Sequence, residues 1–170
     1  MSAELIERFI NTRPCIVVAP DYRKAYTEPY PAGFNDCYET MLWANDNAAQ
    51  LGAGANGLMV AGHSAGGGLA AAVTLKARDT GDVNIAFQMP IYPMIDDEQP
   101  QDAERNIDVP VWNTRTNRIG WQAYLAALEQ SGCASPAYAA AARNSDYAGF
   151  PPTITFVGTL EPFYRETQAY

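Results

Sequence analysis

The chain has 170 residues, 48% of them hydrophobic, and a formal net charge of −8. This is enough for one globular domain with a sizeable core. The acidic balance argues against a nucleic acid or an anionic membrane surface as a partner. No apolar run approaches the roughly 20 residues of a membrane span, and the first residues do not resemble a signal peptide.

The cysteines, Cys15, Cys37 and Cys133, are odd in number and widely spaced. This pattern indicates reduced thiols in a cytoplasmic protein, rather than a disulfide framework or a zinc site. We expect Cys15 and Cys37 to be buried as small apolar side chains. We expect neither a cofactor nor a bound metal, and the oligomeric state is left open.

The first third of the chain alternates helical and strand patterns. Apolar residues at helical spacing predict a helix over 3–11, and a continuous apolar run predicts a strand over 14–20, buried on both faces in a parallel sheet. A second amphipathic helix is expected over 34–50. The glycine-rich stretch 51–57 ends it and forms a loop.

The stretch 58–70, LMVAGHSAGGGLA, reads as a short apolar strand, a serine between glycines, and a tightly packed helix. This is the nucleophile-elbow pattern Gly-x-Ser-x-Gly, in which a sharp strand-to-helix turn exposes the serine hydroxyl. Gly62 and Gly66 are expected to leave room for the strained backbone. Ser64 is therefore the candidate nucleophile, and the alternative is a glycine-rich turn without chemistry.

The rest of the chain continues the alternation. We expect a strand over 83–92 that ends near Pro90, a short helix over 121–128, a strand over 152–158 and the start of a helix at 167–170. Arg115 and Arg118 are assigned to a solvated loop. The region near 97–130 is a candidate lid-like insertion. Strands that alternate with helices predict an α/β fold with a mostly parallel sheet, in one domain over 1–170.

Several motifs in order resemble the hormone-sensitive-lipase-like branch of the α/β-hydrolase fold. They are VVAPDYR at 17–23, PYPA at 29–32, GHSAGGGLA at 62–70, QMPIYPM at 88–94 with Asp96 and Asp97, SP at 135–136, PP at 151–152, and GTLEPF at 158–163. The resemblance implies a carboxylesterase or lipase that acts on small ester molecules.

The resemblance also implies roles for individual residues. Ser64 matches the nucleophile that forms an acyl-enzyme, and the backbone N–H of Ala65 matches one donor of the oxyanion hole. Glu161 lies where the family has the acid of the triad. We interpret Asp96 and Asp97 as structural, and an acid role for either is the less favoured alternative. His63, next to the serine, is badly placed to act as its base.

Two parts of the family pattern are absent: the His-Gly-Gly-Gly oxyanion loop and the catalytic histidine, since His63 is the only histidine. We therefore expect this chain to be an internal piece of a longer hydrolase that is inactive as it stands. In the family, the strand with the glycine loop lies between strand 14–20 and the elbow strand, so these two are expected to face a gap.

Two other functions stay open. The chain could be a non-catalytic binding module with a hydrolase fold, although such a module has no need of a strained serine. An amidase or deacetylase would use the same triad on a different substrate.

Overall fold

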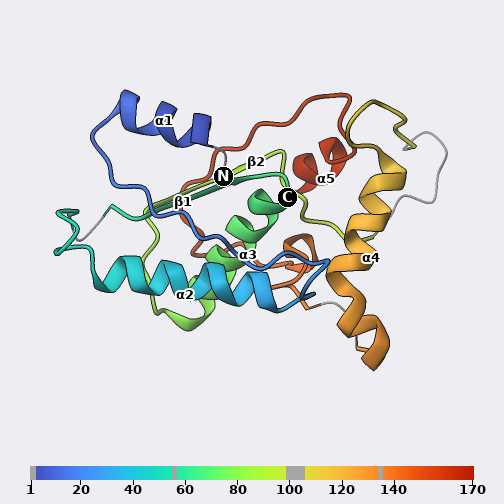
Figure 1. Cartoon of the computed structure of the whole chain (residues 1–170), viewed down its shortest axis with the longest axis horizontal. Helices are drawn as coiled ribbons and strands as arrows, with labels where there is room; N and C mark the ends of the chain where they lie inside the picture. Colours follow the sequence, from blue (N-terminus) through green and yellow to red (C-terminus); the bar gives the residue numbers. More distant parts are fainter. Residues whose placement is uncertain (1–2, 55–56, 99–105, 134–135) are drawn as a thin grey trace.

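The computed structural model of the chain describes residues 3–54, 57–98, 106–133 and 136–170. Within these residues the elements occur in the order α1 (Ala3–Thr12), α2 (Ala32–Asp46), β1 (Met59–His63), α3 (Ala65–Thr80), β2 (Phe87–Ile91), α4 (Thr114–Ser131), a short 3₁₀ helix (Ala141–Arg143) and α5 (Tyr164–Ala169). The expected alternation of strands and helices is confirmed, and Figure 1 shows its arrangement.

In the described part of the chain the sheet has two regular strands, β1 and β2, which are parallel and joined through α3. Their register pairs Met59 with Phe87 at one end and His63 with Ile91 at the other. A parallel pair needs a crossover connection, and a helix is the usual one. Both strands end at the same edge of the sheet, and β1 leads directly into the serine turn.

The expected strand 152–158 is present only as two isolated parallel bridges, Gln88 with Thr153 and Ile91 with Phe156. The Gln88 side-chain amide also donates a hydrogen bond to Thr153 Oγ1 at 2.9 Å. Strand β2 therefore has β1 on one side and the segment 153–156 on the other. The order along the sheet is β1, β2, then this segment.

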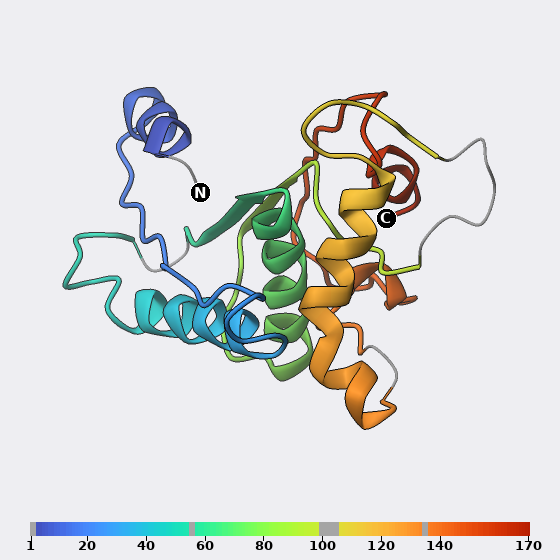
Figure 2. The ribbon, with the colours of Figure 1, turned by 45° about the vertical axis from the view of Figure 1, so that its right-hand side comes forward.

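The main core lies between α3 and α2, which pack on one side of the sheet. In Figure 2, α3 lies between α2 and α4. Five of the nine buried residues of α3 are glycine or alanine, so the neighbouring elements approach it closely. The buried cluster consists of Phe34, Tyr38, Met41, Leu69, Ala72, Val73, Ala77, Val83 and Ile85.

The helix predicted over 121–128 is longer than expected and covers Thr114–Ser131. Its start is a capping box, in which the Asn113 side chain accepts from the Thr116 N–H and the Thr116 side chain accepts from the Asn113 N–H. Arg115 and Arg118 therefore lie on this helix, and their assignment to a loop was wrong. Trp121 and Leu125 face inward, with 3% and 5% of their surfaces exposed.

The strand predicted over 14–20 is wrong, because these residues form no strand in the structure. Ile16 and Val18 are 46% and 38% exposed, and Cys15 is exposed rather than buried. An apolar run becomes a buried parallel strand only when neighbouring strands pair with it. Among the described residues, no strand pairs with the outer edge of β1.

Further findings concern the insertion, the cysteines, membrane spans and metal sites. Of the lid-like insertion expected near 97–130, residues 99–105 lie outside the described part, as does Ser135 of the SP motif. Cys37 is half-buried and Cys133 is exposed. None of the described helices combines the length and apolar character that crossing a membrane requires. No group of three or more His, Cys, Asp or Glu side chains in the described ranges could hold a metal ion.

Candidate active site

Ser64 lies at the sharp turn between β1 and α3, as the motif predicts. Its backbone has φ 55° and ψ −125°, a region that L side chains rarely adopt. The residue is half-buried, and Ala65, the first residue of α3, is exposed. A serine held in this conformation at a strand end is turned out of the sheet.

The glycines around Ser64 differ in what they contribute. A Cβ atom on Gly62 would overlap the carbonyl oxygen of Gly66, whereas a Cβ on Gly66 would meet nothing within 4 Å. The expectation that Gly66 is needed for its own lack of a Cβ was wrong. The following glycines are the tight ones: a Cβ on Gly68 would overlap the Met94 carbonyl, and one on Gly67 would lie 3.0 Å from the Ile91 oxygen.

Backbone hydrogen bonds hold the turn from both sides. The Ser64 N–H donates to the Ile91 carbonyl at 3.0 Å, and the Ser64 carbonyl accepts from the N–H groups of Gly67, Gly68 and Met94 at 2.9, 3.1 and 3.1 Å. The N–H groups of Gly67 and Gly68 are occupied by these bonds. Ala65 is the first residue of α3, where the positive end of the helix dipole favours negative charge, so its N–H is the candidate donor beside the serine.

Glu161 lies in a turn after the last sheet segment. Phe156 pairs with Ile91 at the end of β2, and Glu161 follows five positions later, before α5. Its N–H donates to the Gly158 carbonyl, and its own carbonyl accepts from the Tyr164 N–H, both at 3.1 Å. Figure 1 shows α5 beyond the ends of β1 and β2 that carry Ser64. Glu161 therefore belongs to the same edge of the sheet as the serine.

His63 is the residue just before the serine, and its ring faces Tyr92, with 6.0 Å between ring centroids. Burial lowers the pKa of His63 below its usual value, so the imidazole is neutral at pH 7. Its Nε2 atom is buried without a hydrogen-bond partner among the described residues. The structure records no hydrogen bond between His63 and Ser64 in this part of the chain.

Asp97 is held by Arg143, which donates two hydrogen bonds to its carboxylate at 2.6 and 3.0 Å. This bond raises the pKa of the Arg143 guanidinium above its ordinary value. Asp96 accepts from the Glu98 N–H at 2.9 Å in a local turn. Arg143 was not singled out in the sequence, because its partner lies 46 positions away and no local pattern marks the pair.

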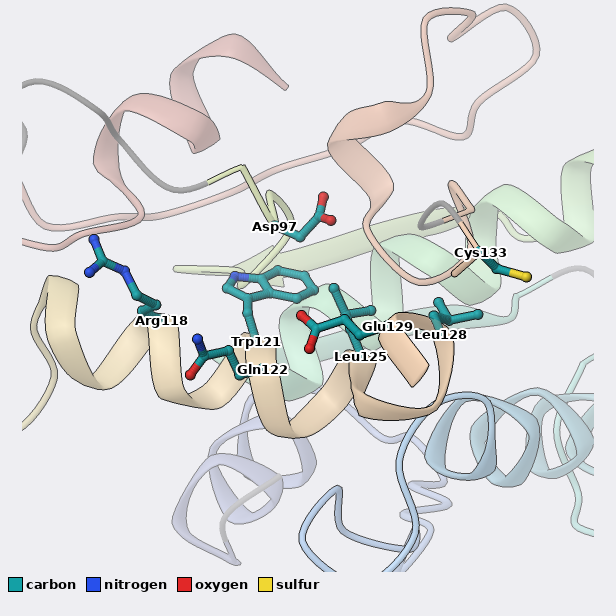
Figure 3. Close-up of a pocket in the computed structure, with 8 residues that line it drawn as sticks. All are labelled: Asp97, Arg118, Trp121, Gln122, Leu125, Leu128, Glu129 and Cys133. Atoms are coloured by element: carbon teal, nitrogen blue, oxygen red, sulfur yellow. The ribbon is translucent and has the colours of Figure 1, made fainter. Parts of the chain in front are cut away.

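A pocket of about 310 Å³ runs along α4 and has Asp97 in its lining. Neither Ser64 nor Glu161 lines this pocket. Its lining, shown in Figure 3, consists of Asp97, Arg118, Trp121, Gln122, Leu125, Leu128, Glu129 and Cys133. The candidate active site is therefore the edge of the sheet around Ser64 rather than this pocket.

Comparisons with known proteins show the family of the chain. A family model described as alpha/beta hydrolase fold matches residues 1–170. The chain belongs to this family. The resemblance read from the motifs is thus confirmed, as is the α/β-hydrolase fold.

Several relatives are named as esterases. The chain is 37% identical over 148 residues to Carboxylesterase NlhH of Mycobacterium tuberculosis, covering 86% of this chain and 46% of that protein. The structure of esterase LipW from Mycobacterium marinum superposes with a TM-score of 0.80 at 33% identity, covering 88% of this chain and 46% of that one. The chain thus spans about half the length of these relatives. Some relatives have different names, among them Gibberellin receptor GID1A of Arabidopsis thaliana, which is 24% identical over 162 residues, covering 92% of this chain and 46% of that protein.

Proposed function

We propose that the protein is a serine carboxylester hydrolase whose nucleophile is Ser64. The observation that carries the proposal is the backbone of Ser64, strained at φ 55° at the junction of β1 and α3, in a chain related to carboxylesterases. Strain of this kind costs about 1–3 kcal/mol, and a serine turn without chemistry gains nothing from it.

In the proposed reaction the Ser64 oxygen bonds to the ester carbonyl carbon and its proton passes to a general base. The carbonyl oxygen becomes an oxyanion, which the Ala65 N–H stabilises at the start of α3. The bond to the alcohol oxygen then breaks and the base returns the proton to the leaving alcohol. Water repeats the sequence on the acyl-enzyme and frees the acid.

The general base is the part that this sequence does not supply. Glu161 is proposed to orient an imidazole, but His63 is the only histidine. The 170-residue chain is therefore proposed to turn over esters very poorly, because the serine keeps its proton. Full activity requires a histidine, and further oxyanion donors, from residues beyond these 170.

The test is covalent labelling by a fluorophosphonate, which reacts with an activated serine. Incubating the 170-residue chain with millimolar probe for hours should add one phosphonate, and peptide mapping should place it on Ser64. Labelling within seconds would contradict the absence of a working base. If the Ser64→Ala variant is labelled equally, Ser64 is not the nucleophile.

A binding module is the second candidate, because one relative over 92% of this chain is named a receptor. A module that only binds has no reactive serine, so it predicts no probe on Ser64 under any condition. An amidase would label like an esterase and differs only in cleaving anilides in place of esters.

A further inference from the structure

Two residues with unusual backbones end the two paired strands. His63 pairs with Ile91 in the register of β1 and β2, so the next residues, Ser64 and Tyr92, lie side by side at the strand ends. Ser64 has φ 55° and Tyr92 has φ 33°. Neither is a glycine, and a bulky aromatic residue at positive φ is rare. Strained non-glycine residues cluster at functional sites.

The backbone of Tyr92 is fixed next to the serine. Its N–H donates to the Phe156 carbonyl at 2.6 Å, while the residues on either side, Ile91 and Pro93–Met94, contact the serine turn. The Met94 N–H donates to the Ser64 carbonyl and the Ile91 carbonyl accepts from the Ser64 N–H. The chain thus wraps around Ser64 with Tyr92 at the bend.

No hydrogen bond of the Tyr92 side chain within the described residues accounts for its strained backbone. Its phenol makes no recorded hydrogen bond within the described residues, and its ring is half-buried against His63. The ring is thus only partly covered, and it belongs to the residue that lies next to Ser64 across the paired strand ends. A flat, rigid aromatic group beside a nucleophile limits the size of what can approach it.

We propose that Tyr92 is a specificity residue that forms one wall of the acyl site and restricts it to short acyl groups. This inference rests on the proposed function of Ser64. A smaller side chain at position 92 would open space beside the nucleophile, so longer acyl groups would react better relative to short ones. Differences in pocket size of this kind change selectivity by about tenfold or more.

The test compares two alkyl fluorophosphonates, one with a methyl and one with an octyl group on phosphorus. In each reaction the Ser64 oxygen bonds to phosphorus, fluoride leaves and the proton goes to solvent. Intact-mass spectrometry gives the labelling rate for each probe. The ratio of the two rates reports selectivity even when both are slow, because the missing base affects both equally.

Tyr92→Ala is expected to raise the octyl-to-methyl ratio by about tenfold, whereas Tyr92→Phe, which keeps the ring, leaves it unchanged. Tyr26→Ala is the matched control, because Tyr26 is 85% exposed and lies outside the site. If Tyr92→Ala does not fold, Tyr92→Asn replaces it, since asparagine tolerates positive φ.

The outcomes separate the two claims. An unchanged ratio in a folded Tyr92→Ala or Tyr92→Asn variant overturns this inference while labelling of Ser64 still supports the proposed function. Absence of labelling by either probe in all variants overturns the proposed function, and this inference with it.

Discussion

Gly62 packs directly against the carbonyl oxygen of Gly66, with no space between them for a Cβ atom. The contact joins the end of β1 to the first turn of α3, on either side of Ser64. It explains why a glycine is needed two positions before the serine. The glycine two positions after the serine contributes its backbone carbonyl to this contact, and a Cβ atom of its own would meet open space.

The glycine contacts predict an uneven response to substitution. Gly62→Ala and Gly68→Ala should each lower the free energy of unfolding by about 3 kcal/mol, because a Cβ overlaps a backbone oxygen that cannot move away. Gly66→Ala is the matched control and should raise it by about 0.5 kcal/mol, because alanine favours the helix and meets open space. Urea unfolding measures all three. Equal losses at all three positions would contradict the geometry.

The strain at Ser64 predicts that removing its side chain stabilises the fold. Ser64→Gly should raise the free energy of unfolding by about 1 kcal/mol, because glycine adopts φ 55° without strain. Ser64→Ala keeps the Cβ atom and should change it little. If the glycine and alanine variants unfold at the same urea concentration, the turn is not strained by the Cβ atom.

The pair of Arg143 and Asp97 predicts a structural role for an aspartate that the family pattern leaves ambiguous. Only 7% of the Asp97 side chain is exposed, so Arg143→Met leaves a nearly buried carboxylate without its cation. We expect a loss of about 2 kcal/mol, reduced from that of a fully buried pair because Arg143 is partly exposed. Arg8→Met is the control.

Arg8 and Glu4, the control pair, are both exposed. Arg8→Met should therefore change the free energy of unfolding by less than about 0.5 kcal/mol. Thermal melts of the two variants give the comparison. A loss at Arg143 no larger than that at Arg8 would show that Asp97 does not depend on the pair.

The three thiols should react at two different rates with an aromatic disulfide reagent at pH 8. Cys15 and Cys133 are exposed and should react within seconds to minutes. Burial raises the pKa of the Cys37 thiol to about 12, so this side chain is almost entirely protonated and should react far more slowly. Reaction of all three at one rate would mean that the Cys37 thiol is not buried in solution.

The same thiol gives stability a pH dependence. Because the pKa of Cys37 is higher in the folded chain than its ordinary value of 9.0, its contribution is complete below pH 9 and is lost as the pH rises toward 12. The free energy of unfolding should therefore fall with a steeper slope above pH 9 in the wild type than in Cys37→Ala. If the wild type and Cys37→Ala show the same slope above pH 9, Cys37 is not the source of this pH dependence.

The sequence was most informative where structure depends on near neighbours. The turn at Ser64, the strand before it and the helix after it follow from a local pattern, and the structure has all three. Helix α4 begins earlier than its apolar period predicts, because the cap formed by Asn113 and Thr116 depends on polar side chains. The sequence thus held a signal for the start of α4, but this signal was a pair of polar capping residues and no apolar periodicity marked it.

Features that depend on distant partners could not be read this way. The apolar run 14–20 has strand composition, but a strand exists only when another pairs with it, and Ile16 and Val18 remain exposed. The bond between Arg143 and Asp97 and the backbone of Tyr92 likewise arise from tertiary contacts. Of the candidate site, the positions of Ser64 and Ala65 follow from the motif, whereas the roles of Ser64, Ala65 and Glu161 stay predictions.

Strands β1 and β2, with α3 between them, occupy one uninterrupted stretch of chain, residues 59–91. The entropy lost on closing this unit is small because no other segment must first be brought in. We expect its amides to exchange with solvent last in hydrogen-exchange measurements, after those of α1 and of residues 14–20. The serine turn therefore belongs to the part of the molecule that unfolds least often. Its geometry is kept when other parts of the chain unfold locally.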